Sequence, residues 1–362
     1  MGGICIRNND SPIIPGPIKK KKITCDLNYE NCKREIIDKF FLSDFIEKNF
    51  DICFRNKKSI KMINNKNIQY ESICIDKLID KGTYNHIYDI SCENGLFENC
   101  VISSYINSIK KIKNKLSKED YKNFFTQCEI QTILADEYDF VPKIKKSFIT
   151  ENSGRLHIWR IIEKLDVFIS DYFKINNEIS SWLNLLIQIS YKLIIYQKKY
   201  KFNHSDFKYT NIMGKKCKKK NVLYDITLDT GAIVSISYDN NGVDWKFIDF
   251  GFSIIEHDNL QYESYEFYQE KIIFKSDRDL NLFCYSILLF IKDIPNDIKN
   301  FLIYSLKYDN NFSNLEGQIL LPIDEKKEVF LTAYNIFNRD EYNNINCYPI
   351  NFFNNIKSFF NT

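Results

Sequence analysis

The sequence predicts an α+β protein with two lobes, a small N-terminal lobe built on an antiparallel sheet and a mainly helical C-terminal lobe. Short segments rich in Ile, Val and Tyr alternate with turn residues between positions 73 and 163, which is typical of antiparallel strands. Beyond Glu163, apolar residues recur at helical spacing. The chain has 362 residues, of which 44% are hydrophobic and 15% aromatic, so it can bury a core in each lobe.

The N-terminal lobe is expected to span residues 73–163. Turn residues at Lys81-Gly82 and Glu93-Asn94-Gly95 separate three strands, and Asn152-Ser153-Gly154 separates two more. Ser117 is suited to cap the helix that follows it. The expected elements are strands at 72–79, 86–91 and 99–106, a helix at 117–138, and a strand pair at 144–150 and 155–163.

The C-terminal lobe is expected to span residues 164–362. A long amphipathic helix is indicated by the spacing of Trp182, Leu186, Ile189, Leu193 and Tyr196. An insertion at 214–244 carries five lysines between positions 215 and 220. This basic run has two interpretations: a docking site for an acidic substrate or a lipid surface, or the solvated tip of a hairpin.

The N-terminus holds two segments without a chemical signature. Residues 1–22 contain three of the seven prolines and end in four lysines, which predicts a flexible tail. Residues 23–72 form an extension of unknown role, with a helix expected at 31–50. Gly2 and Cys5 also allow attachment of the tail to a membrane surface by acylation, the alternative to a plain tail.

Charge and cysteine usage narrow the classes of function. The net charge of +3 does not predict nucleic acid or a membrane as the main partner. The 11 cysteines have no CxxC spacing, which argues against a disulfide framework or a zinc ribbon and indicates a reducing compartment. The longest apolar run, 282–291, is too short to span a bilayer. We therefore expect a cytoplasmic protein.

The chemical signal lies in two segments of the C-terminal lobe. Residues 204–211 read HSDFKYTN, and Asp249-Phe250-Gly251 follows 38 positions after Asn211, at the end of an apolar strand. Phosphoryl transfer from a nucleotide needs a carboxylate that accepts the proton of the attacking hydroxyl. It also needs oxygen ligands that hold Mg²⁺ on the phosphates. The two segments supply both.

This pair of segments resembles the catalytic and metal-binding segments of the protein kinase family, and the short stretch between Gly251 and Asp279 resembles divergent Ser/Thr protein kinases of large DNA viruses. The resemblance implies a two-lobed protein-kinase-like fold that moves the γ-phosphate of ATP to a Ser or Thr hydroxyl of a protein substrate. It implies Asp206 as the base, Lys208 as the cation at the transferred phosphate, and Asn211 and Asp249 as Mg²⁺ ligands. A viral protein would act in the host cytoplasm or the virion.

The resemblance also assigns roles around the nucleotide. Gly82 corresponds to the middle glycine of a hairpin that covers the phosphates, and 161–165, with Glu163 and Leu165, to the hinge that holds adenine. Glu129 corresponds to the helix glutamate that pairs with a strand lysine. Asp279 corresponds to the aspartate that braces the catalytic loop, while His204 is expected to be structural.

The sequence departs from the family pattern at several points. Ser103 or Ser104 stands where the strand lysine is expected, so an active enzyme needs a substitute cation, for which Lys81, Lys111 and Lys110 are the candidates. Ser205 replaces the arginine before the catalytic aspartate, no Ala-Pro-Glu follows, and only 27 residues separate Gly251 from Asp279. Two alternatives to an active protein kinase follow: a pseudokinase that binds partners without catalysis, and a small-molecule kinase.

Overall fold

The computed structural model describes residues 51–56, 59–62, 71–81, 85–92, 97–105, 118–152, 155–228, 230–264, 273–306, 315–339 and 341–360. The expected tail at 1–22, the expected helix at 31–50, Gly82, Lys110 and Lys111 lie outside the described residues. Within the described residues the protein is α+β with mainly antiparallel sheets, as the sequence predicts.

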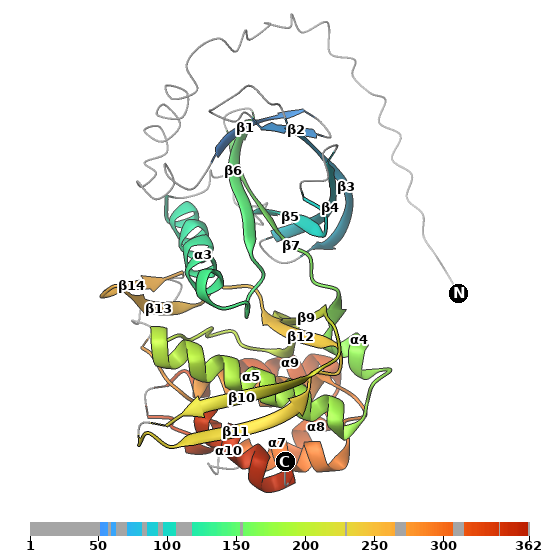
Figure 1. Cartoon of the computed structure of the whole chain (residues 1–362), viewed down its shortest axis with the longest axis vertical. Helices are drawn as coiled ribbons and strands as arrows, with labels where there is room; N and C mark the ends of the chain where they lie inside the picture. Colours follow the sequence, from blue (N-terminus) through green and yellow to red (C-terminus); the bar gives the residue numbers. More distant parts are fainter. Residues whose placement is uncertain are drawn as a thin grey trace, which may run out of the picture.

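Seven of the described strands form one closed barrel (Figure 1). Neighbours pair antiparallel, except that β1 and β6 pair in parallel. The five strands expected between 72 and 163 are confirmed, and two further strands come from the extension 23–72. In spatial order the barrel contains β1 (Asp51–Asn56), β2 (Ser59–Met62), β3 (Glu71–Lys81), β4 (Asn85–Cys92), β5 (Cys100–Tyr105), β7 (Arg155–Glu163) and β6 (Ile144–Asn152).

The two faces of the barrel strands have different side chains because residues alternate between them. Ile102, Ile161, Phe148 and Trp159 are buried in one small core, where the Phe148 and Trp159 rings stack with centroids 6.4 Å apart. Burial of each of these side chains contributes about 1.5–3 kcal/mol. The opposite face of β7 turns Arg160 toward the helix that covers the sheet.

This covering helix is α3 (Lys118–Glu137), whose bounds lie within one residue of the predicted 117–138. It runs along the outside of the barrel (Figure 1). Phe124 and Gln131 contact Arg160 of β7. Ile130 and Leu134 belong instead to the larger core of the helical part. The helix therefore joins the sheet to the rest of the molecule.

The helical part is organised around two buried helices, α5 (Ile179–Tyr200) and α6 (Arg278–Phe290). The apolar stripe predicted from Trp182 to Tyr196 is buried along α5, which confirms the predicted helix. None of the described helices is both long and apolar enough to cross a membrane. The surrounding helices are α4 (Ile169–Phe173), α7 (Asn296–Leu306), α8 (Leu315–Ile319), α9 (Ile323–Phe337) and α10 (Pro349–Phe360).

Short sheets complete the helical part. Strands β8 (Val167–Phe168), β9 (Ile212–Lys216) and β12 (Val243–Phe247) form one sheet. The insertion forms a hairpin of β10 (Asn221–Thr227) and β11 (Ile233–Asp239), and a second hairpin pairs β13 (Ile254–His257) with β14 (Leu260–Glu263).

The insertion hairpin is more than a solvated tip. Tyr224, Ile226 and Ile236 are buried and belong to the main core, so one face of the hairpin packs on the protein. The basic run lies before β10, where Lys215 and Lys219 form ion pairs with Glu163 and Asp239.

Candidate functional site

Strand pairing brings the two predicted segments together. The loop 203–211 leaves α5 and ends in a short 3₁₀ helix, Tyr209–Asn211, directly before β9. Strands β9 and β12 pair with Ile212 opposite Phe247, and the Ile248 N–H donates to the Asn211 carbonyl at 3.0 Å. The turn at Asp249 therefore starts beside the end of the loop.

Three of the predicted side chains of the loop are in contact. Lys208 Nζ lies 2.7 Å from Asp206 Oδ2, and both groups are partly exposed. Asn211 Nδ2 donates to the same Oδ2 at 2.9 Å and to the Asp206 carbonyl at 2.7 Å. The arrangement fixes the Asp206 carboxylate between a cation and an amide, with part of its surface open to solvent.

Asp279, in the first turn of α6, accepts hydrogen bonds from the start of the loop. Its carboxylate accepts the N–H groups of His204 at 2.9 Å and Ser205 at 3.0 Å, and the side-chain amide of Asn203 at 3.3 Å. Burial raises the pKa of Asp279, while the His204 and Ser205 contacts oppose this shift. The prediction that Asp279 braces the loop is confirmed.

His204 and Ser205 have structural roles in the loop. The His204 ring is fully buried and its Nε2 donates to the Ile248 carbonyl at 2.8 Å, which ties the loop to β12 and agrees with the structural role predicted for it. Ser205 has a φ of +62°, a strained conformation for a residue other than glycine. The buried Arg278 donates to Ser205 Oγ at 3.4 Å. An arginine therefore stands beside Ser205 although it comes from α6.

The turn after β12 exposes one carboxylate and buries one ring. Asp249 is exposed and has a φ of +64°, whereas Phe250 is buried. Helix α3 meets this turn through Gln127, because a Cβ at Gly251 would lie 3.5 Å from Gln127 Nε2. Sequence reasoning did not find Gln127, since a neutral glutamine carries no chemical signal.

Glu129 has a different environment from the one the resemblance implies. It is half-buried, burial raises its pKa, and within the described residues no Lys or Arg lies within ion-pair distance of it. Burial raises the pKa of Tyr262 in β14, and the negative charge of Glu129 raises it further. Gln127, one of the neighbouring residues of α3, contacts the Asp249 turn instead.

The expected lysine position is occupied by a buried serine. Ser103 of β5 lies opposite Arg160 of β7, which in turn lies opposite Ser147 of β6. All three side chains are buried. The cation beside Ser103 is thus an arginine on the next strand, which the sequence did not reveal because cross-strand register cannot be read from it. Lys81, the first substitute considered, is exposed at the end of β3.

The expected hinge joins the barrel to the helical part by ion pairs. The Glu163 carboxylate accepts from Lys215 and, at 3.0 Å, from the fully buried Lys246, which also contacts Asp139 Oδ1 at 2.7 Å. Burial by itself raises the pKa of Glu163, but the hydrogen bonds from Lys215 and Lys246 lower it overall. The Glu163 side chain therefore fixes β7 to β9 and β12.

Backbone groups of the same segment differ in their hydrogen bonding. The N–H groups of Glu163 and Lys164 donate to the carbonyls of Lys143 and Asn99 at 3.0 and 2.9 Å. The N–H of Leu165 has no hydrogen-bond partner in the part of the chain that the structure describes. In the segment that the resemblance assigns to the hinge, the Leu165 N–H therefore differs from its two neighbours in having no acceptor among the described residues.

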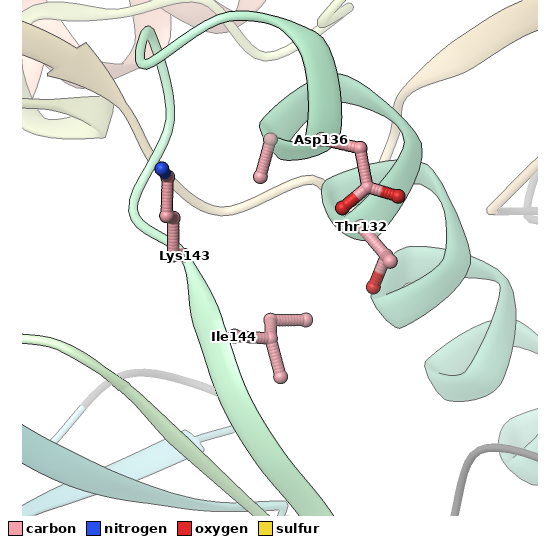
Figure 2. Close-up of a pocket in the computed structure, with 5 residues that line it drawn as sticks. Thr132, Asp136, Lys143 and Ile144 are labelled. Atoms are coloured by element: carbon pink, nitrogen blue, oxygen red, sulfur yellow. The ribbon is translucent and has the colours of Figure 1, made fainter. Parts of the chain in front are cut away.

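Neither of two cavities is lined by a residue of the Asp206 loop or of the Asp249 turn. A cavity of about 150 Å³ lies between Thr132 and Asp136 of α3 and Lys143 and Ile144 across from them (Figure 2). It is too small for a typical organic ligand. A larger one, about 340 Å³, lies between α5 and the insertion hairpin. Among the described residues, no cluster of three His, Cys, Asp or Glu suited to a metal ion occurs.

No protein-family model matches the chain, and no curated protein matches its sequence.

Proposed function

We propose that the protein is a protein-kinase-like phosphotransferase with two lobes, which moves the γ-phosphate of ATP to a Ser or Thr hydroxyl of a protein. The observation that carries this proposal is the braced loop, in which Asp206, Lys208 and Asn211 are in mutual contact next to the Asp249 turn. A carboxylate, a cation and two oxygen donors are what phosphoryl transfer requires. The complete burial of Asp279 and its hydrogen bonds to the loop backbone support a fixed geometry.

The residues present fit Mg²⁺, which prefers oxygen ligands. Both hydrogen bonds of Asn211 use its Nδ2, which leaves Oδ1 for a metal ion. The Asp249 carboxylate is exposed and has no ion-pair partner among the described residues. When bound, Mg²⁺ would supply the charge that neutralises the phosphates. Asp206 would accept the hydroxyl proton and Lys208 would face the transferred phosphate.

The adenine would bind at the junction between the barrel and the helical part. The free N–H of Leu165 provides one donor for the base, and the ion pairs of Glu163 hold this segment in place. Gly82, which the resemblance assigns to the phosphates, lies outside the described residues.

A pseudokinase is the second candidate, and one observation favours it. Ser103 is neutral, so the sheet lacks at this position the lysine that the resemblance pairs with Glu129, and Glu129 has no ion-pair partner among the described residues. A small-molecule kinase is the third candidate because no Ala-Pro-Glu follows Gly251.

Incubation of the purified protein with labelled ATP, Mg²⁺ and a generic basic protein separates the three candidates. The proposal predicts label on the protein acceptor. Label only on added small-molecule acceptors indicates a small-molecule kinase. Nucleotide binding without any phosphate transfer indicates a pseudokinase. A protein that neither binds nucleotide nor transfers phosphate contradicts the proposal.

A further inference from the structure

The interface between the sheet and α3 contains a buried positive charge without a negative partner. Arg160 is 7% exposed, and within the described residues no carboxylate lies within ion-pair distance of its guanidinium. Its Nε is buried and has no hydrogen-bond acceptor. An arginine buried without a counterion is rare, because desolvation of a charge is costly unless an anion compensates it.

The groups that do contact Arg160 are all neutral. Nη1 donates to Gln131 Oε1 at 3.2 Å, and the guanidinium carbon lies 4.9 Å from the centre of the Phe124 ring. The Cys128 thiol is adjacent, but burial raises its pKa to about 11, so it stays protonated and cannot serve as the counterion. The local environment therefore holds the guanidinium without neutralising it.

The position of Arg160 is defined by strand register. It lies directly opposite Ser103, so both side chains leave the sheet on the face that α3 covers. Through Gln131 it contacts the helix that, one turn earlier, places Gln127 against Gly251. The unpaired cation thus belongs to the layer that adjoins the Asp249 turn.

We propose that Arg160 is the cation that binds the phosphates of the nucleotide, in place of a lysine at Ser103. This inference rests on the proposed function. A guanidinium presents several N–H donors in one plane and pairs with two phosphate oxygens at once, which a serine cannot do. Because its present contacts are neutral, Arg160 turns toward an anion without breaking an ion pair.

The test compares titrations of the folded protein with Mg·ATP and with adenosine, which lacks phosphates. Arg160→Met should weaken Mg·ATP binding by about tenfold or more, the size expected for one charge-assisted hydrogen bond pair. Adenosine binding should stay unchanged. Arg160→Lys should lose less Mg·ATP affinity than Arg160→Met. The double variant Ser103→Lys, Arg160→Met should regain Mg·ATP affinity relative to Arg160→Met alone. Lys145→Met, an exposed lysine of β6, is the control.

Each result decides the role of Arg160. Equal Mg·ATP affinity of wild type and Arg160→Met overturns the inference, while the proposed function stands. Equal losses for adenosine and Mg·ATP indicate a structural role and also overturn it. A wild-type protein that binds no Mg·ATP overturns the proposed function as well. If Arg160→Met does not fold, Arg160→Gln, which can keep the hydrogen bond to Gln131, takes its place.

Discussion

The two halves of the candidate site differ in how their charges are compensated. In the loop half, Asp206 has Lys208 and Asn211 as partners, and Asp279 accepts three hydrogen bonds. In the half formed by the sheet and α3, neither Arg160 nor Glu129 has an oppositely charged partner among the described residues. Among the described residues, the charges of Asp206 and Asp279 are therefore compensated, whereas those of Arg160 and Glu129 are not.

This difference predicts different sensitivities. Removing a charge from the loop half breaks contacts that already exist, so it should affect catalysis and stability strongly. Removing a charge from the other half breaks only neutral contacts, so its effect should appear mainly when an anionic ligand is bound. The following variants test this contrast in order of decreasing expected effect.

Asp206→Asn should have the largest effect on activity. The amide preserves the shape of the loop but cannot accept the proton of the attacking hydroxyl. We expect phosphotransfer to fall by about 10²–10⁴-fold, the range typical of a general base. The rate of label transfer from ATP measures this. Asp225→Asn, on the exposed side of the insertion hairpin, is the control. A rate near wild type for Asp206→Asn contradicts the role of Asp206.

Asp279→Ala should have the largest effect on stability. It leaves the buried N–H groups of His204 and Ser205 without an acceptor, each at a cost of about 1–3 kcal/mol. We expect a loss of about 3 kcal/mol in the free energy of unfolding, measured by denaturant titration. Asp297→Ala, in the first turn of α7, should cost under about 1 kcal/mol. Equal losses for both variants contradict the bracing role.

Glu163→Gln should lower stability in a pH-dependent way. The pKa of Glu163 is lowered in the folded protein, so its carboxylate stabilises the fold above the pKa it has when unfolded. This contribution is lost as the pH falls through the lowered pKa. At pH 7 we expect the free energy of unfolding of Glu163→Gln to be about 2 kcal/mol below that of wild type. The loss is not larger because the buried Lys246 keeps Asp139 as a partner. The free energies of unfolding of wild type and Glu163→Gln should converge as the pH is lowered from 7 to 3. A difference between them that stays constant over this range contradicts the ion-pair account.

Gln131→Glu should have the smallest effect on stability and a selective effect on binding. It gives Arg160 a carboxylate partner at the position of its present 3.2 Å contact, but loses the hydrogen bond to the Pro142 carbonyl. We expect stability to change by less than about 1 kcal/mol because these effects offset each other. Mg·ATP affinity should fall severalfold, since Arg160 is then held in an ion pair. Gln131→Met should cause no such fall, and equal effects of both variants contradict the account.

The sequence predicted the loop half of the site better than the other half. Spacing along one segment identifies Asp206, Lys208 and Asn211, because the contacts among them are local. Arg160 of β7 lies opposite Ser103 of β5 and Ser147 of β6, and the register of these strands cannot be read from one sequence. The contact of Gln127 with Gly251 was likewise not predicted, because it depends on the rotation of α3 about its axis, which one sequence does not define.

For the fold as well, the sequence predicted the local elements but not those that depend on pairing between distant strands. Alternating apolar residues and turn signals gave the five strands between 72 and 163, and helical spacing gave α5. Strands β1 and β2 were missed because polar Lys and Asn residues dominate their surroundings, and their place in the barrel depends on pairing with β3 and β6.

The most direct test of the central claim is a calorimetric titration of the protein with ATP, with and without Mg²⁺, for wild type and Asp249→Asn. The account predicts that wild type binds ATP more tightly with Mg²⁺, and that Asp249→Asn loses about tenfold or more of this Mg²⁺-dependent affinity because a charged oxygen ligand is gone. Wild-type affinity that is the same with and without Mg²⁺, or an Asp249→Asn variant that binds Mg·ATP as wild type does, would contradict the assignment of this loop and turn as a site for phosphoryl transfer.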